Sequence, residues 1–196
     1  NALDLAGIPL HASDRNEDHP VIIAGGHACY NPEPMAPFID VFVIGEGEEV
    51  IHEIVESLQA SRKQGYNRYT TIRELRKIPG LYLPAYYKPV YKDDLTLASL
   101  KPVEPDFPEI INKRLCGTLP LPPTRFLVPS IDVVHNRVAM EIMRGCTRGC
   151  RFCHAGMVNR PVRERPATAI VNAIEEALKN TGYEEIALLS LSSSDY

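Results

Sequence analysis

The sequence predicts an α/β protein whose first part is a section of a doubly wound, Rossmann-like sheet. Two short apolar runs end in glycine: Val21–Ala24 is closed by Gly25-Gly26, and Val41–Ile44 is closed by Gly45. Such runs are typical of buried parallel strands, and an amphipathic helix follows the second of them. The 196 residues are 44% hydrophobic and 23% charged, which is a globular composition.

The remaining elements of the first part fit the same fold class. We expect a helix to end before Gly7 and residues 34–38 to form a short helical crossover between the two strands. After Glu48, the apolar residues of the predicted helix fall on one stripe, at Val50, Ile51, Ile54, Val55 and Leu58. We therefore assign residues 1–64 to one partial α/β domain.

Residues 65–130 differ in composition from the first part because they are rich in proline, and they are predicted to form a connector. Ten of the 17 prolines lie between Pro79 and Pro129, and proline removes a backbone donor, so long regular elements are not expected. A short helix is predicted over 71–78 and a strand with aromatic cover over 80–87. The tyrosines occur without interspersed basic residues, so we expect them to pack against a neighbouring domain rather than stack on bases.

Residues 131–196 show the order strand, loop, helix, strand. Residues 131–142 predict two strands about a turn at His135-Asn136-Arg137. Pro166 suits the first position of a helix that ends near Gly182, and residues 186–191 predict the next buried strand. The buried face of that helix is predicted to contain Ile170, Val171, Ile174, Ala177 and Leu178.

Three of the five cysteines, Cys146, Cys150 and Cys153, lie within eight residues on the predicted loop. Thiolates this close in sequence can converge on one metal centre. A zinc site could add His154, although structural zinc sites usually draw on a distant second ligand pair. A disulfide would leave one thiol over, whereas an iron–sulfur cluster bound by three ligands would keep one open iron. We expect the other two cysteines, Cys29 and Cys116, to be ordinary buried thiols.

The C-x3-C-x2-C run resembles the cluster loop of the radical S-adenosylmethionine (radical SAM) enzymes. Phe152 before the third cysteine and the lead-in at 138–145 share in this resemblance. It implies that the three cysteines ligate a [4Fe-4S] cluster whose fourth iron binds S-adenosylmethionine. An electron donor would then drive cleavage of the sulfonium to methionine and a 5′-deoxyadenosyl radical. The resemblance also implies that 131–196 begin a partial TIM-like barrel with its first βαβ unit, and it leaves the catalytic residues toward substrate unknown.

Further site residues follow from the same resemblance. Phe152 is expected to pack beside the adenine or the cluster. Many relatives carry Gly-Gly-Glu after the second strand to receive the amino group of S-adenosylmethionine, and this chain has Ser192, Ser193, Ser194 and Asp195 there. Asp195 is the candidate acceptor for the ammonium group. Residues 137–165 carry a net charge of +5, and we expect Arg148 and Arg151 to tune the field around the cluster.

Two loops of the first part resemble those of the cobalamin-binding-type domain that precedes some radical SAM barrels. They are Gly25–Ala28, which contains His27, and Gly45–Glu49. Many such domains coordinate cobalt through an Asp-x-His-x-x-Gly pattern, which does not occur in this sequence. Cobalamin is therefore left open as a cofactor, with no cobalt-ligand motif to support it.

The remaining features limit the functional classes. No run approaches the roughly 20 apolar residues of a spanning helix, and no leader opens the chain, so we expect a cytoplasmic protein. The barrel that the resemblance implies needs more strand–helix units than follow Cys153, so we expect an internal fragment that is inactive alone. The alternative function is a zinc-stabilised or metal-free binding module without catalysis. RNA binding is a third possibility that the net charge of −4 does not favour. The substrate, the reaction type and the oligomeric state are left open by these motifs.

Overall fold

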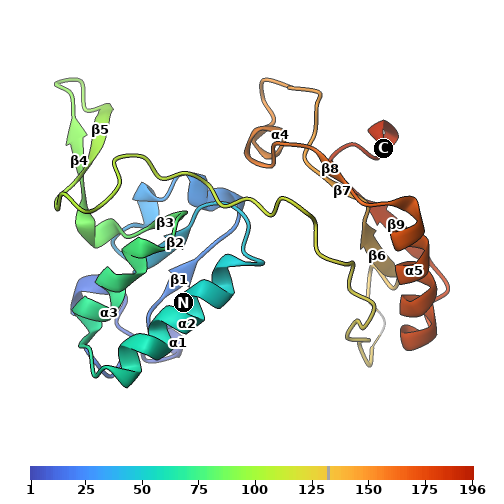
Figure 1. The fold of residues 1–196 in the computed structure, drawn as a ribbon, viewed down its shortest axis with the longest axis horizontal. Helices are drawn as coiled ribbons and strands as arrows, with labels where there is room; N and C mark the ends of the chain where they lie inside the picture. Colours follow the sequence, from blue (N-terminus) through green and yellow to red (C-terminus); the bar gives the residue numbers. More distant parts are fainter. Residues whose placement is uncertain (132) are drawn as a thin grey trace. The chain divides into compact units, whose positions relative to one another are not determined.

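The computed structural model describes residues 1–131 and 133–196 (Figure 1). The chain divides into two compact units, Asn1–Leu115 and Cys116–Tyr196, and each is described by itself. The sequence predicted domain boundaries near residues 64 and 130, and these differ from the division into two compact units after Leu115. The predicted domain boundaries stay a prediction. None of the described helices combines the length and the apolar character that a membrane span requires.

The first unit is built on a three-stranded sheet in the order β1-β2-β3. Its strands are β1 (Ile23–Ala24), β2 (Val41–Val43) and β3 (Leu81–Tyr82). The two predicted apolar runs form the parallel pair β1–β2, with Ile23 opposite Val41. β3 pairs with β2 in the antiparallel direction, so the described sheet is mixed. The α/β class is confirmed, whereas the predicted section of a doubly wound sheet stays a prediction.

Helices cover this sheet, and α2 and α3 lie side by side (Figure 1). The α-helices are α1 (Ala2–Leu5), α2 (Val50–Lys63) and α3 (Arg68–Glu74). Short 3₁₀ turns are η1 (Ala12–Asp14), η2 (His27–Tyr30), η3 (Glu33–Met35), η4 (Leu75–Lys77) and η5 (Pro84–Tyr86). The predicted crossover at 34–38 is thus only one 3₁₀ turn. On α2 the predicted apolar stripe is too wide, because Val50 and Ile54 are buried while Ile51 and Val55 are exposed.

The region predicted as a connector contains regular elements up to Leu115. Pro84 interrupts the predicted strand over 80–87, since proline cannot donate to a ladder. After it, β4 (Tyr87–Tyr91) and β5 (Leu97–Pro102) form an antiparallel hairpin. Tyr86 stacks on Phe107 with ring centroids 4.4 Å apart, and both side chains are buried in the core of the first unit. Aromatic packing therefore draws this Pro-rich stretch into the first unit.

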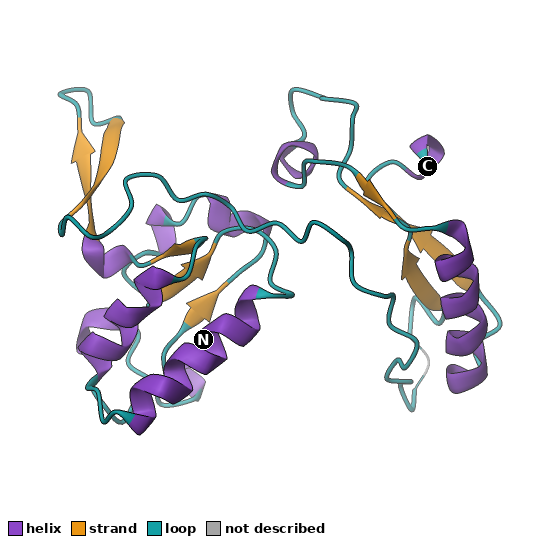
Figure 2. Cartoon of the chain, in the orientation of Figure 1, coloured by secondary structure: helices purple, strands orange, loops and turns teal. Residues whose placement is uncertain are grey.

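The second unit contains a βαβ arrangement (Figure 2). Strands β6 (Val138–Glu141) and β9 (Ile186–Leu189) are parallel, and α5 (Ala167–Thr181) lies between them in sequence and packs on β6. The predicted strand, loop, helix and strand order is confirmed. The remaining elements are β7 (Met143–Arg144), which pairs with β8 (Arg163–Glu164), α4 (His154–Val158) and η6 (Ser193–Asp195).

Several details of the second unit differ from the prediction. Ile131 and Val133 lie outside any strand and Asp132 lies outside the described residues, so the first of the two strands predicted over 131–142 is not found. On α5, Ile170 and Ala177 are buried, but Val171 is exposed. Pro166 is the N-cap rather than the first helical residue, and Gly182 ends the helix at a φ of 73°. The side chains of β9 are largely exposed because its described neighbours cover only part of it. One βαβ unit does not establish the predicted TIM-like barrel.

Candidate metal centre

The cysteine loop begins at a glycine that no other residue could replace without strain. Gly145 follows β7 and has a φ of 93°, in a region that favours glycine. A Cβ atom at this position would lie 2.7 Å from the carbonyl oxygen of Pro161 and 2.9 Å from that of Asn159. The backbone therefore passes close to residues 159–161 just before Cys146, and this contact fixes where the loop starts.

The three cysteines are free thiols on one short loop. Cys146 and Cys153 are partly buried, whereas Cys150 is exposed. Backbone amides serve two of the sulfur atoms: Arg148 N–H donates to Cys146 Sγ at 3.4 Å, and Gly156 N–H donates to Cys153 Sγ at 3.3 Å. Amide donors of this kind stabilise thiolates and tune clusters that thiolates bind. The loop thus already provides part of the environment that a metal-bound thiolate needs.

The spacing of the sulfur atoms bears on the kind of metal centre. Within the described ranges, the Sγ atoms of the three cysteines do not all lie within 4.8 Å of one another. Ligands of one tetrahedral zinc ion, at about 2.3 Å from the metal, would lie roughly 3.8 Å apart. In an iron–sulfur cluster each cysteine binds a different iron, so its thiolates stand further apart. The described loop therefore does not hold the three thiols in the arrangement of a single tetrahedral zinc site.

Phe152 is 92% exposed and packs on no core cluster of the described chain. Its predicted contact with the adenine or the cluster involves groups that the chain does not itself supply, so it stays a prediction.

Asp195 is joined to the cysteine loop by an ion pair that the sequence did not reveal. Arg148 Nε donates to Asp195 Oδ2 at 2.7 Å, and Arg148 Nη2 pairs with Oδ1. Ser192 Oγ donates to the same carboxylate at 2.8 Å. The hydrogen bonds from Arg148 and Ser192 hold the pKa of Asp195 below its usual range. The segment after β9 and the cysteine loop are therefore brought together across 47 residues of sequence.

The other two serines lie on the same turn. Ser193 Oγ is hydrogen bonded to Ser190 Oγ at 2.8 Å, and Ser194 lies within η6. The bond between Ser193 and Ser190 shapes the turn that carries Asp195.

Glu141, at the end of β6, joins two of the arginines that the sequence assigned to a basic field. Its Oε1 accepts from Arg144 Nε at 3.0 Å, and its Oε2 accepts from Arg165 Nη2 at 2.8 Å. Burial alone would raise the pKa of Glu141, but hydrogen bonds and charge from Arg144 and Arg165 outweigh it and lower that pKa. The predicted field is thus partly neutralised. Among the described residues of this stretch, Arg137, Arg144, Arg148 and Arg165 take part in ion pairs.

Comparisons with known proteins address both units. A family model for the N-terminal region of radical SAM proteins matches residues 1–84, and a model for the radical SAM superfamily matches residues 140–196. These matches support a radical SAM protein. The second match begins within β6 and contains the three cysteines, Phe152 and Asp195, so the candidate site lies wholly inside it.

A curated relative is the "Uncharacterized protein MJ0966" of Methanocaldococcus jannaschii. It is 24% identical over 185 residues, which cover 93% of this chain and 34% of the relative. The chain therefore spans about a third of the length of that protein. No solved structure matches the chain.

Proposed function

We propose that the chain is part of a radical SAM enzyme in which Cys146, Cys150 and Cys153 ligate a [4Fe-4S] cluster. The observation that carries the proposal is a C-x3-C-x2-C loop, directly after a strand, within a region similar to the radical SAM superfamily. When bound, the cluster supplies the electron that cleaves S-adenosylmethionine to methionine and a 5′-deoxyadenosyl radical. An external electron donor is part of the proposal, and the substrate and the reaction on it are not specified.

The residues of the chain have separate roles in this proposal. The cysteines hold the cluster, and the N–H groups of Arg148 and Gly156 stabilise two of their sulfur atoms. Asp195 receives the ammonium group of S-adenosylmethionine, for which it exchanges part of its pairing with Arg148. Ser192, already bonded to that carboxylate, keeps it oriented during the exchange. Phe152 has an exposed ring face for the adenine.

For residues 1–64 we propose the fold of a cobalamin-binding-type domain, and we leave cobalamin open as a cofactor. The parallel pair β1–β2 with α2 after it supports the fold. The sequence lacks the Asp-x-His-x-x-Gly pattern, so cobalt coordination is not proposed for His27.

The proposal is tested by anaerobic reconstitution with iron and sulfide. We expect about four irons per chain and an electron paramagnetic resonance signal after reduction with dithionite. The signal should shift when S-adenosylmethionine is added. Alanine at any one of Cys146, Cys150 and Cys153 should abolish the signal. Cys29→Ala and Cys116→Ala are matched controls, because these thiols lie outside the loop, and they should retain it.

Asp195→Asn separates binding of S-adenosylmethionine from binding of the cluster. The variant should keep its iron and lose the spectral shift at concentrations of S-adenosylmethionine that shift the parent signal. A colourless chain with stoichiometric zinc, seen also in a longer form of the protein, would contradict the enzyme proposal and support the zinc-stabilised binding module.

A further inference from the structure

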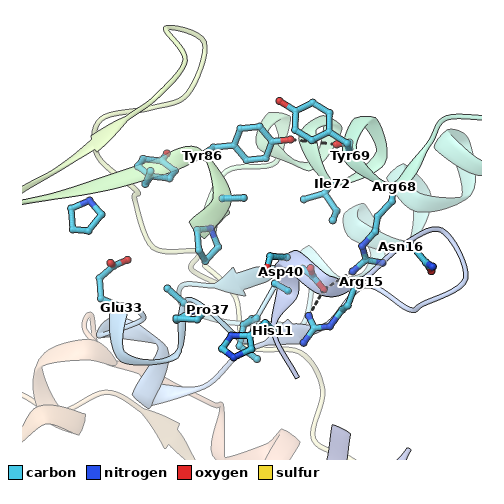
Figure 3. A pocket seen from close by; sticks show the side chains of 18 of the residues that line it. His11, Arg15, Asn16, Glu33, Pro37, Asp40, Arg68, Tyr69, Ile72 and Tyr86 are labelled. Atoms are coloured by element: carbon cyan, nitrogen blue, oxygen red, sulfur yellow. Dashed lines mark hydrogen bonds and ion pairs between the residues drawn. The ribbon is translucent and has the colours of Figure 1, made fainter. Parts of the chain in front are cut away.

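The first unit contains a cavity of about 570 Å³ (Figure 3). Its lining comes from η1, η3, α3 and η5 and includes Asp40, which directly precedes β2. The cavity therefore lies at the amino end of β2, whereas ligands of open α/β sheets bind at the carboxyl ends. Its volume is in the range of small-molecule sites.

Buried charges form one side of this cavity. Asp40, Arg15 and Arg68 have side chains that are 4%, 0% and 10% exposed. Asp40 Oδ2 accepts three hydrogen bonds: from Arg15 Nη1 at 2.9 Å, from Arg68 Nη2 at 2.8 Å and from Ile22 N–H at 2.7 Å. Figure 3 shows the carboxylate between the two guanidinium groups. This is a rigid arrangement, because a buried charge is held by several partners at once.

The donors of the two arginines are largely used within the chain. Arg15 donates from Nη2 to the carbonyl oxygens of Leu10 and Phe38, and from Nε to that of Pro9. Arg68 donates from Nη1 to the carbonyl oxygen of His19. The guanidinium groups are thereby committed to the backbone and to one oxygen of Asp40, so they offer little to an anionic ligand.

Acceptors, by contrast, remain available in the lining. Among the described residues, none donates a hydrogen bond to Asp40 Oδ1. Glu33 accepts from the hydroxyl of Tyr82 on Oε1, and its Oε2 receives no donor from the described chain. With Glu17, the lining holds three carboxylates against two guanidinium groups, a net charge of −1 with neutral His11. A ligand that donates hydrogen bonds and carries positive charge would satisfy these oxygens.

The opposite wall is aromatic and apolar. Tyr69 and Tyr86 have ring centroids 5.6 Å apart, and Ile72 lies beside them in Figure 3. The hydroxyl of Tyr86 donates to the carbonyl oxygen of Tyr69, and that of Tyr87 donates to the carbonyl oxygen of Pro108. These tyrosines thus present rings rather than polar atoms to the cavity, and ring faces attract cations and pack on apolar groups.

We propose that this cavity binds a small organic cation that carries a primary ammonium group on an aromatic or branched apolar body. The ammonium group donates to Asp40 Oδ1 and to Glu33, and the apolar body packs against Tyr86 and Ile72. The site is independent of the cysteine loop, since every lining residue belongs to the first unit.

The test compares three probes of similar shape and different charge on the 196-residue chain. They are 2-phenylethylammonium, neutral 2-phenylethanol and anionic 3-phenylpropionate, each titrated by calorimetry at pH 7. We expect saturable binding of the cation, at least tenfold tighter than that of either other probe. No saturable binding of the cation to the folded chain would overturn the proposal. Equal binding of all three probes, or preference for the anion, would overturn it as well.

Variants that spare the buried ion pairs test the location. Glu33→Gln removes one charge but keeps an acceptor for Tyr82, so it should weaken the cation about threefold or more without unfolding the chain. Ala85→Trp places a large side chain at an exposed position of the lining and should abolish binding. Glu56→Gln, an exposed carboxylate of α2 outside the lining, is the matched control and should bind as the parent does. Unchanged affinity in the first two variants would place the probe elsewhere and overturn the site.

Discussion

Apolar burial and ion pairs stabilise the interior of each of the two units, but their extent differs between the units. The first unit, Asn1–Leu115, has fourteen buried residues in its apolar core, whereas the second, Cys116–Tyr196, has seven. The candidate cluster loop belongs to the second unit, where Glu141 and Asp195 connect segments through arginine. The ion pairs also differ in burial: those of Asp40 in the first unit are buried, whereas Glu141 and Asp195 are partly exposed, so loss of charge should cost the first unit more.

Removing a buried charge should have the largest effect on the free energy of unfolding, and the loss should be greater in the first unit than in the second. Arg15→Met removes a side chain that is 0% exposed and leaves Asp40 and three backbone carbonyls short of donors. We expect the free energy of unfolding of the first unit to fall by about 3–5 kcal/mol. Arg165→Met in the second unit should cost less, about 1–2 kcal/mol, because its partner Glu141 is one third exposed and keeps Arg144.

Urea unfolding of both variants measures this difference, with the exposed Arg62→Met of α2 as the control. A cost for Arg165→Met equal to that for Arg15→Met would mean that solvent screening does not separate the two ion-pair networks.

Core truncation tests whether the two units unfold separately. Ile54 in the first unit and Met140 in the second are both 0% exposed. Alanine at either position should lower the free energy of unfolding of its own unit by about 2–5 kcal/mol. Seven of the nine tyrosines lie in the first unit, so near-ultraviolet circular dichroism reports mainly on it. Ile54→Ala should shift that signal to lower urea and Met140→Ala should not; a shift by both would show one cooperative structure.

The sequence predicted features that depend on local patterns and missed those that depend on contacts between distant residues. Apolar runs predicted β1 and β2, and the order of apolar and amphipathic segments predicted the βαβ unit, because these patterns are local in the sequence. The predicted burial of β9 was wrong, since its side chains are largely exposed. The hairpin β4–β5 was missed, since Pro89 lies within β4 and proline argues against strands away from an edge. In the candidate site, the cysteine spacing was local and therefore visible. The pairing of Arg148 with Asp195 joins residues 47 positions apart, which no local pattern encodes.

Acid should weaken the second unit through Glu141. The pKa of this carboxyl lies below its ordinary value of 4.5, so its contribution to stability is complete above about pH 4.5 and is lost as the pH falls through the folded-state value. We expect a contribution of about 0.5–1 kcal/mol, because the side chain is one third exposed.

Glu141→Gln should therefore reduce the difference in unfolding free energy between pH 7 and pH 3.5, measured in urea on the second unit. If the difference were the same in the parent and in the variant, the ion pairs of Glu141 with Arg144 and Arg165 would not contribute to the stability of the second unit.

Replacing the exposed apolar residues of α2 should have the smallest effect. The predicted stripe included Ile51 and Val55, which are 45% and 43% exposed, beside the fully buried Ile54. Ile51→Gln and Val55→Gln should each change the free energy of unfolding of the first unit by no more than about 0.5 kcal/mol. Urea unfolding against Ile54→Ala measures the contrast along one helix. A cost above 2 kcal/mol at either exposed position would mean that the first unit buries this face in solution, and that its core is larger than fourteen residues.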